Sequence, residues 1–390
     1  MIAKTHLEKA EDYLNNGMIE KAIKEYKLAA DSNPSDFDLN LNLGAAYLQL
    51  KQTDEALSYL KKAAKLKPKN PMPWNNMGLC HLQKGEIKKA VSSFISAIKL
   101  DPLNADANLN LSELLFLDKD YEKAIQYAET VLKGQEKRHL AFYRIAMCHR
   151  AQNNFETAIK YYKKSFKVKP DFLDAKVDLG FTYLYSQQYN SAIREFNQSL
   201  NLNERIASAH YGLGVALYMT QNINTAQKAF NTALQLNPDI VDAYLYLGLC
   251  EKLNGNFIKA IEYYKATLQI KPDYDKAMYN MALAYESLKK DEKALEYYKM
   301  AFASNPLNYK SMNNIGLIYK HKGNYQEAIR WFEKASSLLK DNNFIKLNLA
   351  VSYLNLGNII KAKKLLTGII ETEKENSVLY KAAREAISKL

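Results

Sequence analysis

Apolar and small residues recur along the chain with a period of 34 residues. One column of this pattern is alanine without exception, at Ala22, Ala56, Ala90, Ala124, Ala158, Ala192, Ala226, Ala260, Ala294, Ala328 and Ala362. A second column, twelve positions earlier, holds only alanine, glycine or serine from Ala10 to Ala350. Small residues at fixed positions indicate two helices that approach each other closely, so the pattern predicts a helical hairpin repeated eleven times.

Proline, glycine and aromatic residues predict the ends and the packing of each hairpin. Seven of the nine prolines lie at multiples of 34: Pro34, Pro68, Pro102, Pro170, Pro238, Pro272 and Pro306. Glycine ends the first helix in several repeats, at Gly17, Gly85, Gly255, Gly323 and Gly357, because glycine tolerates a positive φ. Four residues after each alanine, most repeats carry an aromatic residue or leucine. Since one hairpin cannot bury this face alone, stability is expected to come from stacking.

The same register predicts the domain organisation. With the recurrent proline at position 32, the repeats are 3–36, 37–70, 71–104, 105–138, 139–172, 173–206, 207–240, 241–274, 275–308, 309–342 and 343–376. No insertion or deletion interrupts them. Residues 377–390 form one more amphipathic segment, which we predict to be a C-terminal capping helix with a solvated outer face. The chain is therefore expected to hold no separate catalytic domain.

The third repeat resembles a known family. It carries Trp74, Met77, Gly78, His81, Ala90, Phe94 and Pro102, close to the tetratricopeptide pattern W-x2-L-G-x2-Y, A-x3-F, P. This resemblance covers residues 3–376 and implies an all-α fold, a right-handed α-solenoid in which the hairpins wind as a superhelix. It also implies a concave groove lined by the first helices, and a role in binding other proteins.

Composition and charge exclude several classes of protein. Hydrophobic residues make up 47% and charged residues 25% of the chain, as in folded helical proteins. The net charge of +12 is spread among interleaved acidic and basic residues, and the lysine runs on the predicted second helices lack interleaved aromatics, so nucleic acid is not the expected partner. The sequence shows neither an apolar signal segment at its N-terminus nor a stretch long enough to span a bilayer. The expected location is cytoplasmic.

No residue pattern in the sequence points to catalysis, a cofactor or a metal. Cys80-His81 and Cys148-His149 resemble metal-ligand pairs, but adjacent helical residues point about 100° apart and the pairs lie two repeats from each other. The three cysteines share one repeat position, where a small buried residue is the simpler interpretation. No catalytic triad, HExxH or phosphate-loop motif is present. We therefore expect a protein that is not an enzyme and that needs no cofactor.

Asparagine at position 6 of the repeat is the candidate binding feature. It occurs in six of eleven repeats, although asparagine is about one residue in eleven of this chain. An amide can donate to and accept from a peptide backbone at once, so a row of amides can hold an extended segment of any sequence. The row resembles the asparagine ladder of the O-linked N-acetylglucosamine transferase family. The six residues are Asn42, Asn76, Asn110, Asn280, Asn314 and Asn348.

Two interpretations besides a continuous ladder stay open for this column, and one binding mode of the family is disfavoured. Asparagine could be a tolerated exposed residue in a chain rich in asparagine. The column is also interrupted in the middle of the chain, where the neighbouring candidates are aromatic or apolar: Tyr143, Met147, Phe181, Tyr211, Tyr218 and Tyr279. Lysine is absent from position 5, which disfavours the clamp for terminal carboxylates known in chaperone-binding relatives. The groove could thus combine two backbone-binding ends with an adhesive middle.

The sequence as a whole predicts a non-catalytic scaffold or adaptor for protein-protein interaction that binds an extended peptide segment of a partner in its groove. One alternative is a regulatory accessory subunit of a separate enzyme. A second, less favoured alternative is a basic helical-repeat binder of RNA or of an anionic membrane, which would show steeply salt-dependent binding.

Overall fold

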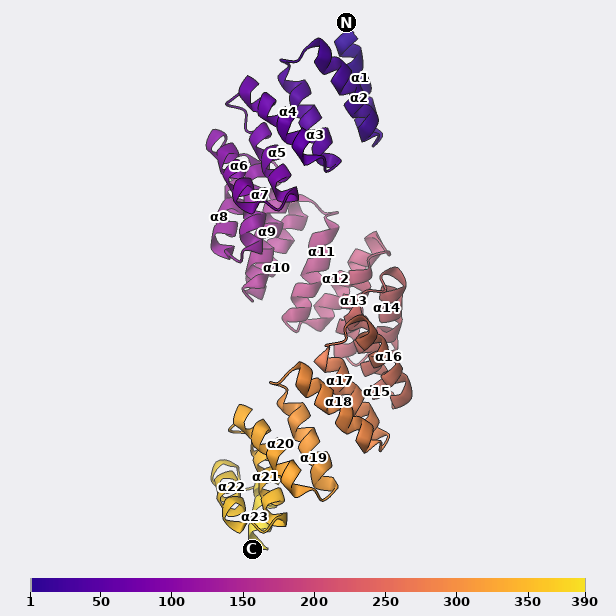
Figure 1. Cartoon of the computed structure of the whole chain (residues 1–390), viewed down its shortest axis with the longest axis vertical. Coiled ribbons are helices and arrows are strands. Elements are labelled where there is room, and N and C mark those ends of the chain that lie inside the picture. Colours follow the sequence, from indigo (N-terminus) through magenta and orange to yellow (C-terminus); the bar gives the residue numbers. More distant parts are fainter. Residues whose placement is uncertain (1, 390) are drawn as a thin grey trace. The chain divides into compact units, whose positions relative to one another are not determined.

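Helical hairpins make up the whole described fold. The computed structural model describes the backbone of residues 2–389 and the side chains of residues 5–389. Within this range the chain forms 23 α-helices and no strand. Consecutive helices pair as antiparallel hairpins that stack on their neighbours, as the ribbon shows within each unit (Figure 1). The all-α solenoid predicted from the repeat pattern is therefore confirmed.

The helices belong to two compact units, here called unit 1 and unit 2, divided between Leu202 and Asn203. Unit 1 contains α1 (Ile2–Asn15), α2 (Ile19–Ser32), α3 (Phe37–Gln49), α4 (Thr53–Leu66), α5 (Met72–Gln83), α6 (Ile87–Leu100), α7 (Ala105–Leu117), α8 (Tyr121–Val131), α9 (Arg138–Ala151), α10 (Phe155–Val168), α11 (Leu173–Tyr185) and α12 (Tyr189–Leu202). Unit 2 contains α13 (Ala207–Met219), α14 (Ile223–Leu236), α15 (Val241–Leu253), α16 (Phe257–Ile270), α17 (Asp275–Ser287), α18 (Asp291–Ser304), α19 (Tyr309–His321), α20 (Tyr325–Leu338), α21 (Asn343–Asn355), α22 (Ile359–Thr372) and α23 (Val378–Ser388).

The invariant alanine and the residue four positions later form the centre of each hairpin. All eleven alanines of the column are 0% exposed, since a larger side chain there would push the two helices apart. The large residues four positions later are buried as well, and in six repeats they lie against a glycine of the facing helix, five times as an aromatic ring and once as Leu60. A Cβ placed on Gly180 would lie only 2.7 Å from Cε1 of Phe196. Ring and glycine therefore fit each other as a pair.

The turn between the two helices of each hairpin has the same backbone geometry in all eleven repeats. Its residue at position 15 has a positive φ, between 58° and 77°. Glycine occupies this place in five repeats, as expected from the sequence, but lysine, asparagine or glutamine occupies it in the other six: Lys51, Lys119, Asn153, Gln187, Gln221 and Lys289. Stacking of the hairpins outweighs the local preference of these residues, which for most side chains disfavours this conformation by about 1–2 kcal/mol.

The C-terminal helix α23 covers the last hairpin. It packs against α21 and α22, and its Ala383 joins a cluster with Leu366 and Ile369. Ser377 caps its N-terminus by accepting a hydrogen bond from the backbone N–H of Tyr380. The assignment of residues 377–390 as a cap, and the exact boundaries of the eleven repeats, stay predictions.

A buried carboxylate joins three helices of unit 2. Glu251 on α15 is 3% exposed, and it accepts hydrogen bonds from Gln227 at 3.1 Å and from Asn256 at 2.8 Å. Its carboxylate also pairs with Lys259 Nζ at 2.7 Å. Burial by itself would raise the pKa of Glu251, but the hydrogen bonds from Lys259, Asn256 and Gln227 outweigh it and hold the pKa below its ordinary value. The ionised form therefore links α14, α15 and α16.

We expect Glu251→Ala to lower the free energy of unfolding by about 2 kcal/mol at neutral pH, because it removes several hydrogen bonds to a charged group. Since the folded-state pKa is depressed, this contribution is present above the ordinary carboxyl pKa and is lost as the pH falls through the folded value. Urea unfolding followed by circular dichroism at several pH values measures the difference. The exposed Glu371→Ala is the control, and a difference between Glu251→Ala and wild type that grows toward acidic pH would contradict the argument.

Candidate functional site

The first helices of the hairpins in unit 1 form a hollow of about 690 Å³, here called the unit-1 hollow. It lies on α7, α9 and α11 and on the turn that follows α9. Its walls are mostly aromatic or apolar, and Tyr185 is 58% exposed at its edge. The lining residues are Phe116, Met147, Arg150, Ala151, Asn153, Phe155, Asp178, Phe181 and Tyr185.

An ion pair neutralises the polar part of the unit-1 hollow. Arg150 Nη1 lies 2.8 Å from Asp178 Oδ1, and Tyr143 donates its hydroxyl hydrogen to Asp178 Oδ2 at 2.7 Å. Burial and the nearby Asp178 carboxylate raise the pKa of Tyr143, so its hydroxyl stays a donor. The hollow thus offers apolar walls beside a compensated charge pair, which suits an apolar or aromatic side chain.

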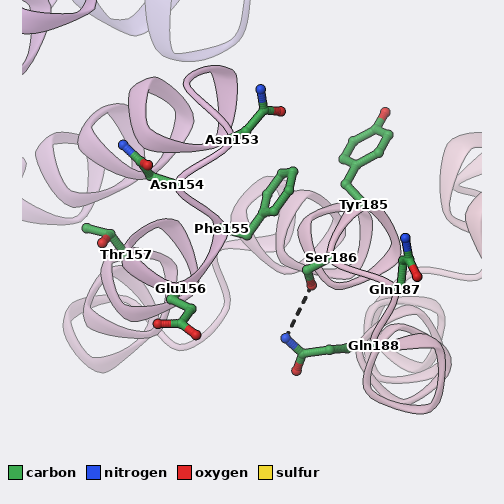
Figure 2. Close-up of a pocket in the computed structure, with 9 residues that line it drawn as sticks. All are labelled: Asn153, Asn154, Phe155, Glu156, Thr157, Tyr185, Ser186, Gln187 and Gln188. Atoms are coloured by element: carbon green, nitrogen blue, oxygen red, sulfur yellow. Dashed lines mark hydrogen bonds between the residues drawn. The ribbon is translucent and has the colours of Figure 1, made fainter.

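A second, more polar recess of about 570 Å³ adjoins the unit-1 hollow and shares Asn153, Phe155 and Tyr185 with it. It lies between two successive hairpin turns, those after α9 and α11. Figure 2 shows the rings of Phe155 and Tyr185 pointing to the same side, with the polar residues of the turns around them. Gln188 Nε2 donates to Ser186 Oγ at 3.3 Å. A segment bound in the hollow would find hydrogen-bonding groups at this end.

Unit 2 has a hollow of its own, of about 550 Å³, here called the unit-2 hollow. It lies on α13, α15, α17 and α19, which are again first helices of hairpins. Four tyrosines give it an aromatic character, and two lysines stand at its rim. The lining residues are Tyr211, Asp242, Leu245, Tyr246, Leu249, Tyr274, Lys276, Tyr279, Asn280, Asn308 and Lys310.

Hydrogen bonds hold the polar residues of the unit-2 hollow in place. The Tyr274 hydroxyl donates to the Asp242 carboxylate, and burial together with this carboxylate raises the pKa of Tyr274. Lys252 Nζ donates to Asn280 Oδ1 at 3.0 Å, while Asn280 Nδ2 donates to the backbone carbonyl of Lys276 at 2.8 Å. Because an amide has two N–H groups and two acceptor lone pairs, Asn280 keeps one donor and one acceptor site for a ligand.

The six predicted asparagines all lie on first helices, but they differ in their surroundings. They are Asn42 on α3, Asn76 on α5, Asn110 on α7, Asn280 on α17, Asn314 on α19 and Asn348 on α21. Of these, Asn280 lines the unit-2 hollow, and the other five line neither hollow. Five of the six are half-buried, whereas Asn348 is buried, with 8% of its surface exposed. Asn348 therefore has less accessible surface for a partner than the other five asparagines.

Several of these amides bind neighbouring repeats within the chain. Asn314 Nδ2 donates to the Tyr298 hydroxyl at 2.9 Å. Tyr298 is the large core residue of the preceding hairpin.

In unit 1 a further pair of amides follows a different pattern, because Asn110 Nδ2 donates to Asn75 Oδ1 at 2.9 Å. The position-6 column therefore also connects successive hairpins, a role that the sequence analysis did not anticipate.

Comparisons with known proteins agree with this architecture. Models described as tetratricopeptide repeat match residues 7–71, 75–139, 139–172, 207–240, 239–305 and 309–342, and a model described as TPR repeat matches residues 180–221. The chain belongs to the tetratricopeptide repeat family. As a member of this family it is a protein-interaction scaffold, which confirms the general function predicted from the repeats.

Several solved structures are similar to this chain, and one of them reaches a TM-score of 0.50, which indicates a similar fold. PilF of Pseudomonas aeruginosa is 16% identical, with 56% of this chain and 97% of that one covered at a TM-score of 0.50. MamA is 32% identical over 45% of this chain and 96% of its own, with a TM-score of 0.40. Yeast Tom70 is 17% identical over 99% and 96% of the two chains, with a TM-score of 0.49. No curated protein matches the chain.

A set of contacts between neighbouring tetratricopeptide repeats escaped the sequence analysis. A cation at position 12 donates to the position-6 residue of the next repeat, 28 residues later, in three places: Arg150 to Asp178, Lys252 to Asn280 and Lys320 to Asn348. The signal was present in the sequence as cation and polar residue 28 positions apart. It could be interpreted only once the stacking of successive first helices was known.

The cysteines considered as metal ligands in the sequence are buried residues of the tetratricopeptide hairpins. Cys80, Cys148 and Cys250 are buried, and burial raises the pKa of each thiol, to about 11, about 11 and about 12 respectively. Among the described residues, no three histidine, cysteine or acidic side chains come together as a metal site would need. No helix in the described part of the chain is long and apolar enough to cross a membrane.

The aromatic candidates divide between the two hollows and their surroundings. Met147 and Phe181 line the unit-1 hollow, and Tyr211 and Tyr279 line the unit-2 hollow. Tyr143 does not line the unit-1 hollow, but its hydroxyl donates a hydrogen bond to the lining residue Asp178. Tyr218 packs edge-on against Tyr246, with ring centres 5.4 Å apart.

Proposed function

We propose that this tetratricopeptide repeat chain is a non-catalytic adaptor that holds an extended segment of a partner protein against the first helices of its hairpins. The observation that carries the proposal is that both hollows lie mainly on first helices and share repeat positions 6 and 9, in unit 1 and again in unit 2. A surface that repeats along the chain suits a ligand that also repeats, and an extended backbone presents the same amide and carbonyl groups at every residue.

The position-6 amides support a role in holding that backbone. Asn280 has the best placement, because it lines the unit-2 hollow and keeps one donor and one acceptor site beyond its bonds to Lys252 and Lys276. We extend this proposal to Asn42, Asn76, Asn110 and Asn314, and with less accessible surface to Asn348. The apolar walls of the hollows would take side chains of the same segment.

Selection of peptides from a displayed library of random dodecapeptides on the full-length protein tests this function. We expect peptides to be selected, and we expect Asn280→Ala to weaken their binding about tenfold, because two hydrogen bonds to the peptide backbone are removed at about 0.5–1.5 kcal/mol each. Fluorescence anisotropy of a labelled peptide gives the affinities, and circular dichroism confirms that the variant is folded.

The matched control is Asn231→Ala, which changes an exposed asparagine on the second helix α14 of the same unit. If Asn280→Ala and Asn231→Ala leave affinity equally unchanged, the amide does not bind the backbone. If no peptide is selected at all, the proposal of an extended-segment adaptor is wrong.

A further inference from the structure

Two arginines on the first helix α9 of unit 1 are neutralised within the fold. Arg150 pairs with Asp178 at 2.8 Å, and Arg144 Nη2 lies 3.2 Å from Glu113 Oε2. Arg150 stands at position 12 of its repeat and lines the unit-1 hollow, and Arg144 stands at position 6 of the same helix. A ligand therefore finds their charges already compensated.

The cations on the first helices of unit 2 lack such partners. Four lysines occupy positions 2 and 12 of three successive repeats, Lys252, Lys276, Lys310 and Lys320, and none forms an ion pair with the described residues. Lys252 and Lys320 bind only neutral amides, those of Asn280 at 3.0 Å and Asn348 at 2.8 Å. Both are half-buried, and this burial lowers the pKa of each. The exposed Lys276 and Lys310 line the unit-2 hollow.

The carboxylates on the same surface do not neutralise these lysines. Asp242 accepts a hydrogen bond from the Tyr274 hydroxyl, and Glu286 accepts one from the Tyr298 hydroxyl at 2.7 Å. Neither is in an ion pair within the described part of the chain. The surface therefore carries four cations against two carboxylates that are already hydrogen-bonded to tyrosines. This excess of positive charge attracts a negatively charged ligand.

We propose that the unit-2 hollow and the lysines around it bind an acidic stretch of the partner, with aspartate or glutamate side chains next to an apolar or aromatic residue. This inference rests on the proposed function and specifies the chemistry of the segment. A carboxylate that reaches Lys276 or Lys310 gains a charge-assisted hydrogen bond, and Lys252 gains a charged neighbour in place of a neutral amide. Side-chain carboxylates are meant, since the sequence lacks the residues that clamp a chain terminus.

The arrangement of the tyrosines favours a peptide over a nucleic acid. Phosphates could also approach the lysines, but base recognition needs open aromatic faces on which to stack. Tyr246 stacks on Phe230 with ring centres 5.3 Å apart, and Tyr211 packs edge-on against it at 6.2 Å. Tyr279 packs against the buried Tyr298 at 5.6 Å. These contacts use ring faces on which bases would have to stack, so the hollow suits a peptide better than a nucleic acid.

The random dodecapeptide library distinguishes this inference from the function itself. We expect peptides selected on the wild-type protein to be enriched in Asp and Glu relative to the unselected library. We also expect Lys276→Glu/Lys310→Glu to abolish that enrichment and to weaken an acetylated and amidated selected peptide by at least about tenfold, as loss and reversal of two charges predict. The matched control is Lys228→Glu on α14, an exposed lysine without an ion pair in unit 2, which should change the affinity less than about twofold.

Each of the other possible outcomes would overturn one part of the proposal. Peptides without acidic enrichment, or acidic peptides that bind Lys276→Glu/Lys310→Glu as well as wild type, would overturn the acidic segment and leave the adaptor function intact. Displacement of the selected peptide by an equimolar uridine dodecanucleotide would assign the lysines to nucleic acid instead. Absence of any selected peptide would overturn the function, and this inference with it.

Discussion

Phe332→Ala is expected to lower the free energy of unfolding by about 3–5 kcal/mol, because it removes a fully buried aromatic side chain. The ring of Phe332 on α20 fills the space opposite Gly316 on α19, where a Cβ would lie 2.7 Å from Cε1 of the ring. It belongs to a cluster that reaches α21 through Ile345 and Leu349. Glycine cannot fill the space that the ring leaves, so the cavity persists and three helices lose contacts.

Urea unfolding followed by circular dichroism measures this loss. Phe344→Ala is the matched control, since Phe344 is 53% exposed and its removal should change stability by less than about 0.5 kcal/mol. Comparable losses in the two variants, or a loss below about 1 kcal/mol for Phe332→Ala, would show that the core aromatic is not the main link between these hairpins.

Arg150→Ala is expected to lower the free energy of unfolding by about 3 kcal/mol, because it leaves the Asp178 carboxylate without its cation in a largely buried place. The two side chains are 21% and 20% exposed and lie 2.8 Å apart. Tyr143 alone would remain as a donor to Asp178. The double variant Arg150→Leu/Asp178→Leu should lose less than the single one, since it leaves no unpaired charge behind.

Arg330→Ala is the control for this pair. Its ion pair with Glu327 has a similar separation of 2.5 Å, but Arg330 is 73% exposed, so its loss should have an effect of about 0.5 kcal/mol or less. If Arg150→Ala lowered the free energy of unfolding as little as Arg330→Ala, Asp178 would be well solvated after the substitution. If the double variant were less stable than the single one, the ion pair itself would be the stabilising element.

The sequence predicted the fold because the contacts that build it are short in range and identical from repeat to repeat. Ala260 and Tyr264, for example, face α15 from the next helix of the same hairpin, and both are 0% exposed. Each column of alanine, glycine or aromatic residue therefore records one packing requirement eleven times. Periodicity then identifies the helices, the turns and the core without knowledge of how one hairpin lies on the next.

The candidate site could be predicted from the sequence only in part. The position-6 column correctly pointed to first helices, but the sequence could not show that Asn314 binds the Tyr298 hydroxyl or that Asn348 is buried. These properties depend on contacts between repeats, where a side chain meets residues 16 or 28 positions away. Rotamers and the stacking of neighbouring helices decide such contacts, and neither leaves a periodic trace in the sequence.

What the sequence by itself determined is the tetratricopeptide hairpin, its core residues and the surface of its first helices, because small and apolar columns follow directly from helix packing. What only the tertiary structure decided is where that surface becomes hollow and which charges on it are compensated. Arg150 and Lys252 occupy the same repeat position, yet one faces a carboxylate and the other an amide in the next repeat. Charge compensation depends on this neighbour, and the neighbour is set by the stacking of the folded hairpins.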